Sequence, residues 1–375
     1  MSAHFKETGE NSIFGNLVYS RIIPQNHFLV KLKGEIPWND FLPQLLPYYK
    51  GEGDLGSRPY HPVMILKMLF LSYLYNLSER QVEEFANFNL PAKYFLGLSA
   101  DETSPDHATL TVFKNRLVAG AGLLPFEQIF EKVIRIALEK GIVFGQVQAI
   151  DATHVPANVN TFKDKMRRER EGKPPRDTDA AWGVKHSHKA HTPEGKTVEV
   201  KDEFYGYKAH VSLNTQTGIM TSLKVSPGNK SDNKFFVPLA RKDRRAGIKP
   251  GIYTGDKGYD DGDNHTYLKD HGLGDAIRLK TTRTDSKSLE NNIYWQAVVR
   301  KPEYQKGLSQ RYRIERSFGD GKVKHGLSRC RYLGLKRFAI QSYLTFACLN
   351  LKRIIKILTS VSLRNESYVY AEVST

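Results

Sequence analysis

The N-terminal part of the chain repeats apolar residues at the spacing of one helix face. Within residues 126–140 the apolar positions lie three or four apart, behind Pro125 and before Gly141, which are typical of a helix start and a helix stop. Ser78 and Gln81 have the spacing of a capping box. From such signals we expect helices over residues 38–46, 62–77, 78–88, 108–119 and 126–140. The first 145 residues are therefore predicted to be all-helical, with little other structure before residue 60.

From residue 147 onward, short apolar runs typical of β-strands replace this pattern. Residues 214–218 have the turn composition that joins two such runs in a hairpin. The expected strands are residues 147–151, 204–213, 218–225, 251–256 and 276–280. The expected helices are residues 232–242, 261–271, 309–322 and 335–358. Strands and helices mixed in this order predict an α/β domain.

Two polar segments interrupt this domain. Residues 161–202 are polar and basic and separate the first two strands, and residues 281–309 form a second loop. The last residues have the character of a frayed tail. The predicted domains are a helical domain over residues 1–145, an α/β domain over residues 146–358 with a basic insertion at 161–202, and a flexible tail over residues 359–375.

The charge of the chain narrows the choice of partner. The formal net charge is +16, and the basic residues form several separate blocks, which favours nucleic acid over a membrane surface. The most apolar segment is broken by Lys67 and is too short to span a bilayer. Cys330 and Cys348 are too few for a disulfide framework or a four-cysteine zinc site, so a reducing cytoplasm is expected.

Three carboxylates have the arrangement that a hard divalent cation needs. Asp151 and Asp256 each end a predicted strand, and neighbouring strands bring such ends together at one edge of a sheet. Glu315 lies on a later helix that could cross this edge. Mg²⁺ takes oxygen ligands with few carboxylates per ion, and two ions together suit phosphodiester chemistry.

Several of these residues also have simpler interpretations. Asp260, Asp261 and Asp263 could replace Asp256 as ligand, although Asp256 is favoured because it ends the strand directly. Asp232 is expected to cap a helix, with a contact to the outer part of the site as the alternative. Taken alone, residues 311–322 are a solvated helix with an internal ion pair.

Three segments resemble bacterial insertion-sequence transposases of the DDE class, specifically the type 5/1182 group. They are Ala149-Ile-Asp151-Ala-Thr, Gly255-Asp256-Lys-Gly-Tyr259 and Arg311-x3-Glu315-x6-Lys322. Supporting blocks are Tyr207-Lys-Ala-His210 and Pro227-Gly-Asn-Lys-Ser-Asp232. The resemblance covers most of residues 55–350. One position departs from it: the tyrosine three residues before Arg311 in the related pattern is Leu308 here, so that contact is vacant or passes to Tyr304 or Tyr312.

The resemblance implies an RNase H-like catalytic core, a mixed sheet flanked by helices, behind an all-helical N-terminal domain. Asp151 and Asp256 would bind Mg²⁺ or Mn²⁺, as two ions, and Glu315 would complete the site. The protein would bind double-stranded DNA at the terminal inverted repeats of its element, as a homodimer in the bacterial cytoplasm and nucleoid. It would cleave the ends by metal-assisted hydrolysis and join the 3′-hydroxyl to target DNA.

The resemblance also places phosphate contacts on basic residues of the catalytic helix. The candidate DNA-binding residues there and beside Asp256 are Arg311, Arg313, Lys322 and Lys257. In the helical domain, residues 108–119 are the candidate reader of the DNA ends through Lys114 and Arg116, with a packing or dimer helix as the alternative. A non-transposing nuclease and a domesticated DNA-binding protein are the alternative functions; a pure binding module would not need three carboxylates.

Overall fold

The computed structural model of the chain describes residues 5–6, 8–9, 13–49, 58–191, 197–280 and 293–363. It divides into two compact units, Met1–Gly122 with Leu351–Thr375, and Leu123–Asn350. The boundaries between these units differ from the predicted domain boundaries at residues 145 and 358, and the predicted domains stay a prediction. Most of the predicted tail lies outside the described residues. None of the helices in the described ranges is long and apolar enough to cross a membrane.

The described part of the first unit contains helices and no β-strand, as predicted. Its helices are α1 (Ile13–Ile22), α2 (Phe28–Glu35), η2 (Trp38–Phe41), α3 (Leu42–Leu45), η3 (Leu46–Tyr48), α4 (Pro62–Leu74), α5 (Glu79–Phe88), α6 (Leu90–Leu96) and α7 (His107–Ala121). Helix α4 is buried along its whole length, and the capping box of Ser78 and Gln81 begins α5. The sequence did not predict α1, α2 and α6, which are short and depend on packing more than on local pattern.

The second unit is built on one mixed sheet, which with its flanking helices confirms the predicted fold class. Its strands are β1 (Val147–Pro156), β2 (Ala181–His191), β3 (Thr197–Asn214), β4 (Met220–Pro227), β5 (Ile252–Gly255) and β6 (Gly274–Ile277). Among the described residues their order is β2-β3-β1-β5-β6, with β4 also paired to β3. Strand β1 is antiparallel to β3 and parallel to β5, and β5 is parallel to β6.

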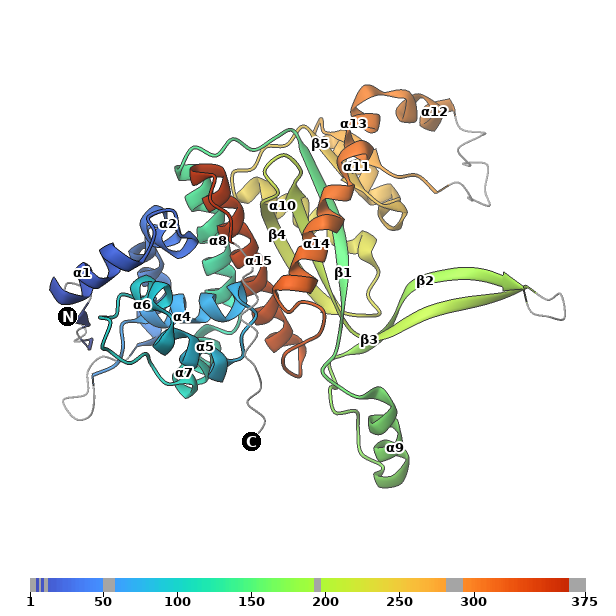
Figure 1. The fold of residues 1–375 in the computed structure, drawn as a ribbon. Coiled ribbons are helices and arrows are strands. Elements are labelled where there is room, and N and C mark those ends of the chain that lie inside the picture. Colours follow the sequence, from blue (N-terminus) through green and yellow to red (C-terminus); the bar gives the residue numbers. More distant parts are fainter. Residues whose placement is uncertain are drawn as a thin grey trace. The chain divides into compact units, whose positions relative to one another are not determined.

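Helices cover both faces of this sheet (Figure 1). On one face, Ile150 and Tyr253 pack in a buried cluster with α10 (Phe236–Arg245) and α11 (Gly262–Asp270). On the other, Val147 and Ile252 pack beside α13 (Pro302–Gln310). The remaining elements of this unit are α8 (Leu124–Glu139), α9 (Thr161–Glu171), η4 (Asp232–Phe235), η5 (Lys257–Tyr259), α12 (Ile293–Arg300), α14 (Tyr312–Lys324) and the first part of α15 (Leu335–Thr359).

The basic insertion is an ordered arm and not an irregular loop. It contains α9, β2 and the first half of β3, and β2 pairs with β3 as a ribbon that projects beyond the sheet (Figure 1). At the base of the ribbon a Cβ on Gly206 would lie 2.3 Å from the carbonyl oxygen of Val155. A Cβ on Gly183 would lie 2.4 Å from that of Gly228. The chain segments cross here at a distance that only glycine allows.

The second predicted loop is also largely helical where it is described. Residues 293–310 form α12 and α13, while residues 281–292 lie outside the described ranges. The helix predicted over residues 309–322 is divided at Arg311, which ends α13 and precedes α14. Helices α12 and α13 pack beside the first residues of β1 and β5, and the junction at Arg311 lies beside Asp151.

Candidate active site

Asp151 and Asp256 come together through the register of two parallel strands. Val147 pairs with Ile252 and Ala149 with Thr254. Continuing this register by two residues on each strand brings Asp151 beside Asp256. Both side chains then lie on the face that carries α13, because alternate residues of a strand share a face. The prediction that Asp151 ends its strand is wrong: β1 runs on to Pro156 with β3 as its partner.

The surroundings of Asp151 oppose its negative charge. Burial and the nearby charge of Asp256 raise the pKa of Asp151 to about 7. The backbone N–H of Ala152, which donates to Oδ1 at 2.8 Å, and the charge of Arg311 act in the opposite direction. Glu315 adds a further, smaller repulsion. Carboxylates that repel one another at a buried edge fit a site for a divalent cation.

The neighbouring acidic residues have other partners in the structure. Asp260 contacts His265, with 3.0 Å between Oδ1 and Nε2, and accepts a hydrogen bond of 2.7 Å from the backbone N–H of Lys280. Asp261 caps α11 by accepting from the backbone N–H of Asp263. Asp256 accepts a local hydrogen bond of 2.8 Å from the backbone N–H of Gly258, and its charge acts on Asp151. These partners favour Asp256 over Asp260 and Asp261.

Arg311 links α14 to β1. Its Nη2 lies 2.6 Å from Oε1 of Glu315, one turn further along, and its Nη1 lies 3.6 Å from Oδ2 of Asp151. The helix is fixed behind it by the buried Phe318, whose ring centroid lies 6.4 Å from that of Phe346. The aromatic contact therefore anchors α14 to the core of this unit.

Lys322 lies further along the same helix and faces another lysine. Burial, and after it the charge of Lys185, lowers the pKa of Lys322. Lys185 sits at a register shift of the β2–β3 pairing, and its side chain is exposed. Two ammonium groups held near each other suit a bound polyanion. No individual role was predicted for Lys185, and only the basic character of the insertion pointed to it.

The other basic candidates lie in different surroundings. Lys257 is exposed directly after Asp256. Arg313 donates a hydrogen bond of 2.6 Å from Nη1 to the carbonyl oxygen of Thr215, which ties α14 to the β3–β4 turn. Of the tyrosines that could replace Leu308, Tyr304 is buried and accepts from the backbone N–H of Leu279 at 3.4 Å. Tyr312 is exposed and is the one that remains accessible.

In the helical unit, the two DNA-binding candidates of α7 differ in exposure. Lys114 is buried and paired with Glu79, which also accepts from Thr111. Lys114 is therefore not accessible as the DNA contact that the sequence led us to expect. Arg116 is exposed, with its guanidinium carbon 4.9 Å from the centre of the Tyr49 ring. Of the two, Arg116 is the accessible basic group.

Asp232 does not cap the helix that follows it. Its Oδ1 accepts from Nζ of Lys208 at 2.9 Å and lies 3.6 Å from Nδ1 of His210. Burial raises the pKa of Asp232, Lys208 lowers it, and Asp256 raises it again. The charge of Asp256 thus acts on this carboxylate, in agreement with the alternative interpretation of Asp232 as a residue of the outer part of the site. Lys208 and His210 belong to a block that carried the family resemblance without an assigned role.

The hydroxyl group of Tyr259 lies near the carboxylates of the site. It is buried and has no hydrogen-bond partner among the described residues. Burial raises its pKa strongly, and Asp151, Asp232 and Asp256 add to the effect. A buried hydroxyl of this kind is costly unless another group completes it. The carboxylates and this hydroxyl together fit a site whose remaining partner is a cation with its water ligands.

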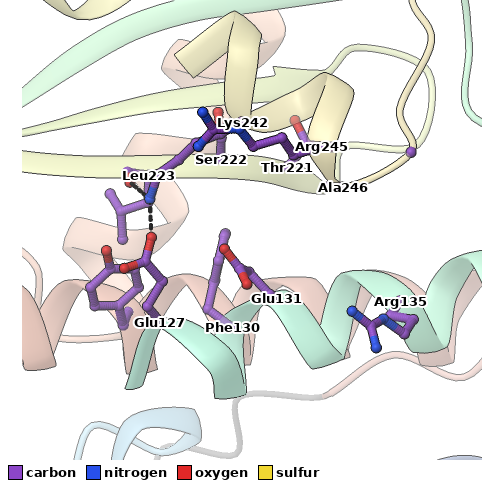
Figure 2. A pocket seen from close by; sticks show the side chains of 12 residues that line it. Glu127, Phe130, Glu131, Arg135, Thr221, Ser222, Leu223, Lys242, Arg245 and Ala246 are labelled. Atoms are coloured by element: carbon purple, nitrogen blue, oxygen red, sulfur yellow. Dashed lines mark hydrogen bonds and ion pairs between the residues drawn. The ribbon is translucent and has the colours of Figure 1, made fainter. Parts of the chain in front are cut away.

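Two other features of the described chain do not form the site. Glu83, Asp106 and His107 could hold a metal by spacing, but Asp106 caps α7 and Nδ1 of His107 lies 2.6 Å from Oε2 of Glu83. A hollow of about 300 Å³ lies between α8, β4, α10 and α15 (Figure 2). Its Glu127 is paired with Lys242, and Asp151, Asp256 and Glu315 do not line it.

Two family models match this chain. Residues 17–116 match the Transposase domain (DUF772) family, and residues 143–351 match the Transposase DDE domain family. The second match spans more than half of the chain, so the protein belongs to the DDE transposases. Both matches together identify it as a DNA transposase of an insertion sequence, an enzyme of a family that uses divalent metal ions to cleave and transfer DNA strands.

Solved structures of other transposases are distant from this chain. A piggyBac transposase synaptic complex with hairpin DNA has a TM-score of 0.41 at 10% identity, covering 93% of this chain and 76% of that one. A Mos1 transposase paired-end complex with the left transposon end has a TM-score of 0.20 at 10% identity, covering 71% and 80%. At these scores the likenesses carry no weight, and the family assignment rests on the sequence matches.

Proposed function

We propose that Asp151, Asp256 and Glu315 are the catalytic carboxylates of this transposase and hold two divalent ions, Mg²⁺ or Mn²⁺. The observation that carries the proposal is geometric. The β1–β5 register sets Asp151 beside Asp256, and Arg311 links Glu315 to Asp151. The unpartnered hydroxyl of Tyr259 and the raised pKa of Asp151 support a cation at this place.

The basic residues around the carboxylates would hold the DNA backbone. Arg311 and Lys322 offer a planar fork and a point charge for phosphate oxygens, and Lys257 adds an exposed ammonium group. When bound, the metal ions would activate water and stabilise the negative charge on the attacking and leaving oxygen atoms of the phosphodiester. Hydrolysis breaks a P–O3′ bond and leaves a free 3′-hydroxyl, which then attacks a phosphodiester of the target and displaces its 3′-oxygen.

The same proposal extends to the partners. The helical unit would bind the terminal inverted repeats, with the exposed Arg116 on α7 as a contact. Two ends require two active sites, so the protein would act as a homodimer on DNA in the bacterial cytoplasm, as a member of the type 5/1182 group. The net charge of +16 supports a polyanionic partner.

A cleavage assay on the repeats that flank the gene tests the site. Asp151→Asn, Asp256→Asn and Glu315→Gln should each lower the cleavage rate by about a thousandfold or more, because each removes a metal ligand. Asp263→Asn is the matched control: it removes an exposed carboxylate seven residues from Asp256 and should cleave normally. Full cleavage by Asp151→Asn, or loss in Asp263→Asn, would reject the assignment. Products joined to target DNA distinguish a transposase from a nuclease that only cuts.

A further inference from the structure

One guanidinium group occupies the space between two of the proposed ligands. Arg311 reaches Glu315 at 2.6 Å through Nη2 and Asp151 at 3.6 Å through Nη1. The side chains of Arg311 and Asp151 are 19% and 16% exposed, so this contact is largely withdrawn from water. An Arg–Glu pair one turn apart on an exposed helix is common and weak. The additional reach to Asp151, on a different element, makes this one a bridge between strand and helix.

The bridge uses the oxygen atoms that a metal ion would need. Oδ1 of Asp151 accepts from the backbone N–H of Ala152, and Oδ2 faces Arg311. Among the described residues, Asp151, Asp256 and Glu315 do not form a group with ligand atoms within 4.8 Å of one another. A cation that binds all three carboxylates must therefore compete with the guanidinium group of Arg311 for the oxygen atoms of Asp151 and Glu315.

The helix itself is held in place independently of this bridge. Arg313 donates to the carbonyl oxygen of Thr215, and Ile314 and Phe318 on the inner side of α14 are buried. Arg311 stands at the junction of α13 and α14 and makes no side-chain cap. Its guanidinium can thus leave the carboxylates by side-chain rotation, while the backbone of the helix remains fixed.

We propose that Arg311 couples DNA binding to metal binding: without DNA its guanidinium holds Asp151 and Glu315 and opposes the metal ion, and a DNA phosphate draws it away. This inference rests on the proposed function. The fork of N–H groups that now faces two carboxylates is the group that would bind phosphate, so the two interactions exclude each other. Lys322 lies eleven residues after Arg311, close to the same face of a helix, and with the nearby Lys185 it would attract the phosphate backbone that takes the guanidinium.

The coupling has a reciprocal consequence. If a DNA end tightens metal binding by some factor, the metal must tighten DNA binding by the same factor. Couplings of this kind typically amount to about 5–150-fold. The device would keep the carboxylates from binding metal, and so from cutting, until a DNA end is present.

Direct measurement of Mn²⁺ binding tests the inference without reference to activity. Free Mn²⁺ is quantified by electron paramagnetic resonance in titrations of the full chain, alone and with a pre-cleaved end duplex. Arg311→Gln should bind Mn²⁺ at least about fivefold more tightly than wild type in the absence of DNA. Adding the duplex should raise the Mn²⁺ affinity of this variant by a smaller factor than that of wild type. Arg311→Lys keeps the charge but not the fork and should lie between the two; it decides the question if Arg311→Gln does not fold.

The matched control is Arg316→Gln, which removes the same charge from an exposed position on the same helix. It should bind Mn²⁺ like wild type. If Arg311→Gln binds no more tightly than Arg316→Gln while Asp151→Asn still weakens binding, the coupling is refuted and the metal site stands. If Mn²⁺ binding is insensitive to Asp151→Asn, the proposed site itself fails and the inference with it.

Discussion

The hydroxyl group of Tyr207 donates a hydrogen bond of 2.5 Å to Oδ1 of Asp177, and both side chains are buried. The other carboxylate oxygen accepts from the backbone N–H of Gly334 at 3.2 Å, and the carbonyl oxygen of Asp177 accepts from the hydroxyl of Tyr205 at 2.5 Å. One aspartate thus joins the insertion to β3 and to the loop before α15. The arm that carries Lys185 is held to the sheet at this point.

Loss of this junction should destabilise the protein. Asp177→Ala leaves the Tyr207 hydroxyl and the Gly334 N–H buried without partners, and we expect a loss of about 3 kcal/mol in unfolding free energy. Tyr207→Phe removes one hydrogen bond and should lose about 1–2 kcal/mol. Asp202→Asn, at an exposed position of β3, should change stability by less than about 0.5 kcal/mol. Denaturant unfolding measures all three, and equal values for Asp177→Ala and Asp202→Asn would refute the role of the junction.

His265 should make stability depend on pH. Its ring lies between Asp275, 2.6 Å from Nδ1, and Asp260, 3.0 Å from Nε2. Burial lowers the pKa of His265, but the hydrogen bonds and charges of these carboxylates outweigh burial and raise the pKa to about 9. Because this folded value exceeds the ordinary 6.5, the stabilisation is fully present below pH 6.5 and is lost as pH rises through 9.

The variant His265→Gln tests this dependence. The unfolding free energy of the wild type should exceed that of His265→Gln by about 2–3 kcal/mol at pH 6. This difference should shrink between pH 8 and pH 10. Denaturant midpoints across this range give the comparison, with His271→Gln, an exposed histidine near the end of the same helix, as the control. A difference that stays constant from pH 6 to pH 10 would show that His265 is not protonated between the two carboxylates.

Lys322 and Lys185 should contribute to DNA binding through charge alone. Replacing either by Met removes one phosphate contact, which should weaken binding and lower the slope of log affinity against log salt by about 1. Lys249 is exposed before β5, at the end of the strand opposite Asp256, so Lys249→Met should leave the slope unchanged. Fluorescence anisotropy at several salt concentrations measures the slopes. Identical slopes for Lys322→Met and Lys249→Met would remove Lys322 from the interface.

Much of the architecture followed from short-range signals. The capping box at Ser78, the apolar face of α8 and the hairpin at residues 214–218 act over a few residues, and each is found in the structure. The positions of β1, β4, β5 and β6, and of the carboxylates on β1 and after β5, also followed from local pattern, whereas β2 lay in the predicted insertion and was missed. Such signals are legible because helix and strand periods and caps depend on neighbouring residues.

Contacts between distant segments decided the rest. Strand β1 extends through its polar residues to Pro156 because β3 pairs with it. Lys114 can be buried because it forms an ion pair with Glu79 of another helix. Arg311 and Arg313 stand two residues apart on similar sequence. One faces Asp151 and the other the carbonyl oxygen of Thr215.

The sequence by itself determined which residues could act: three carboxylates in order along the chain, with basic residues near them. Only the tertiary structure decided which of them meet. The parallel register brings Asp151 beside Asp256. The packing of α14 on the sheet places the guanidinium group of Arg311 between Asp151 and Glu315. Register and helix orientation depend on packing summed over many distant residues, which no local pattern encodes.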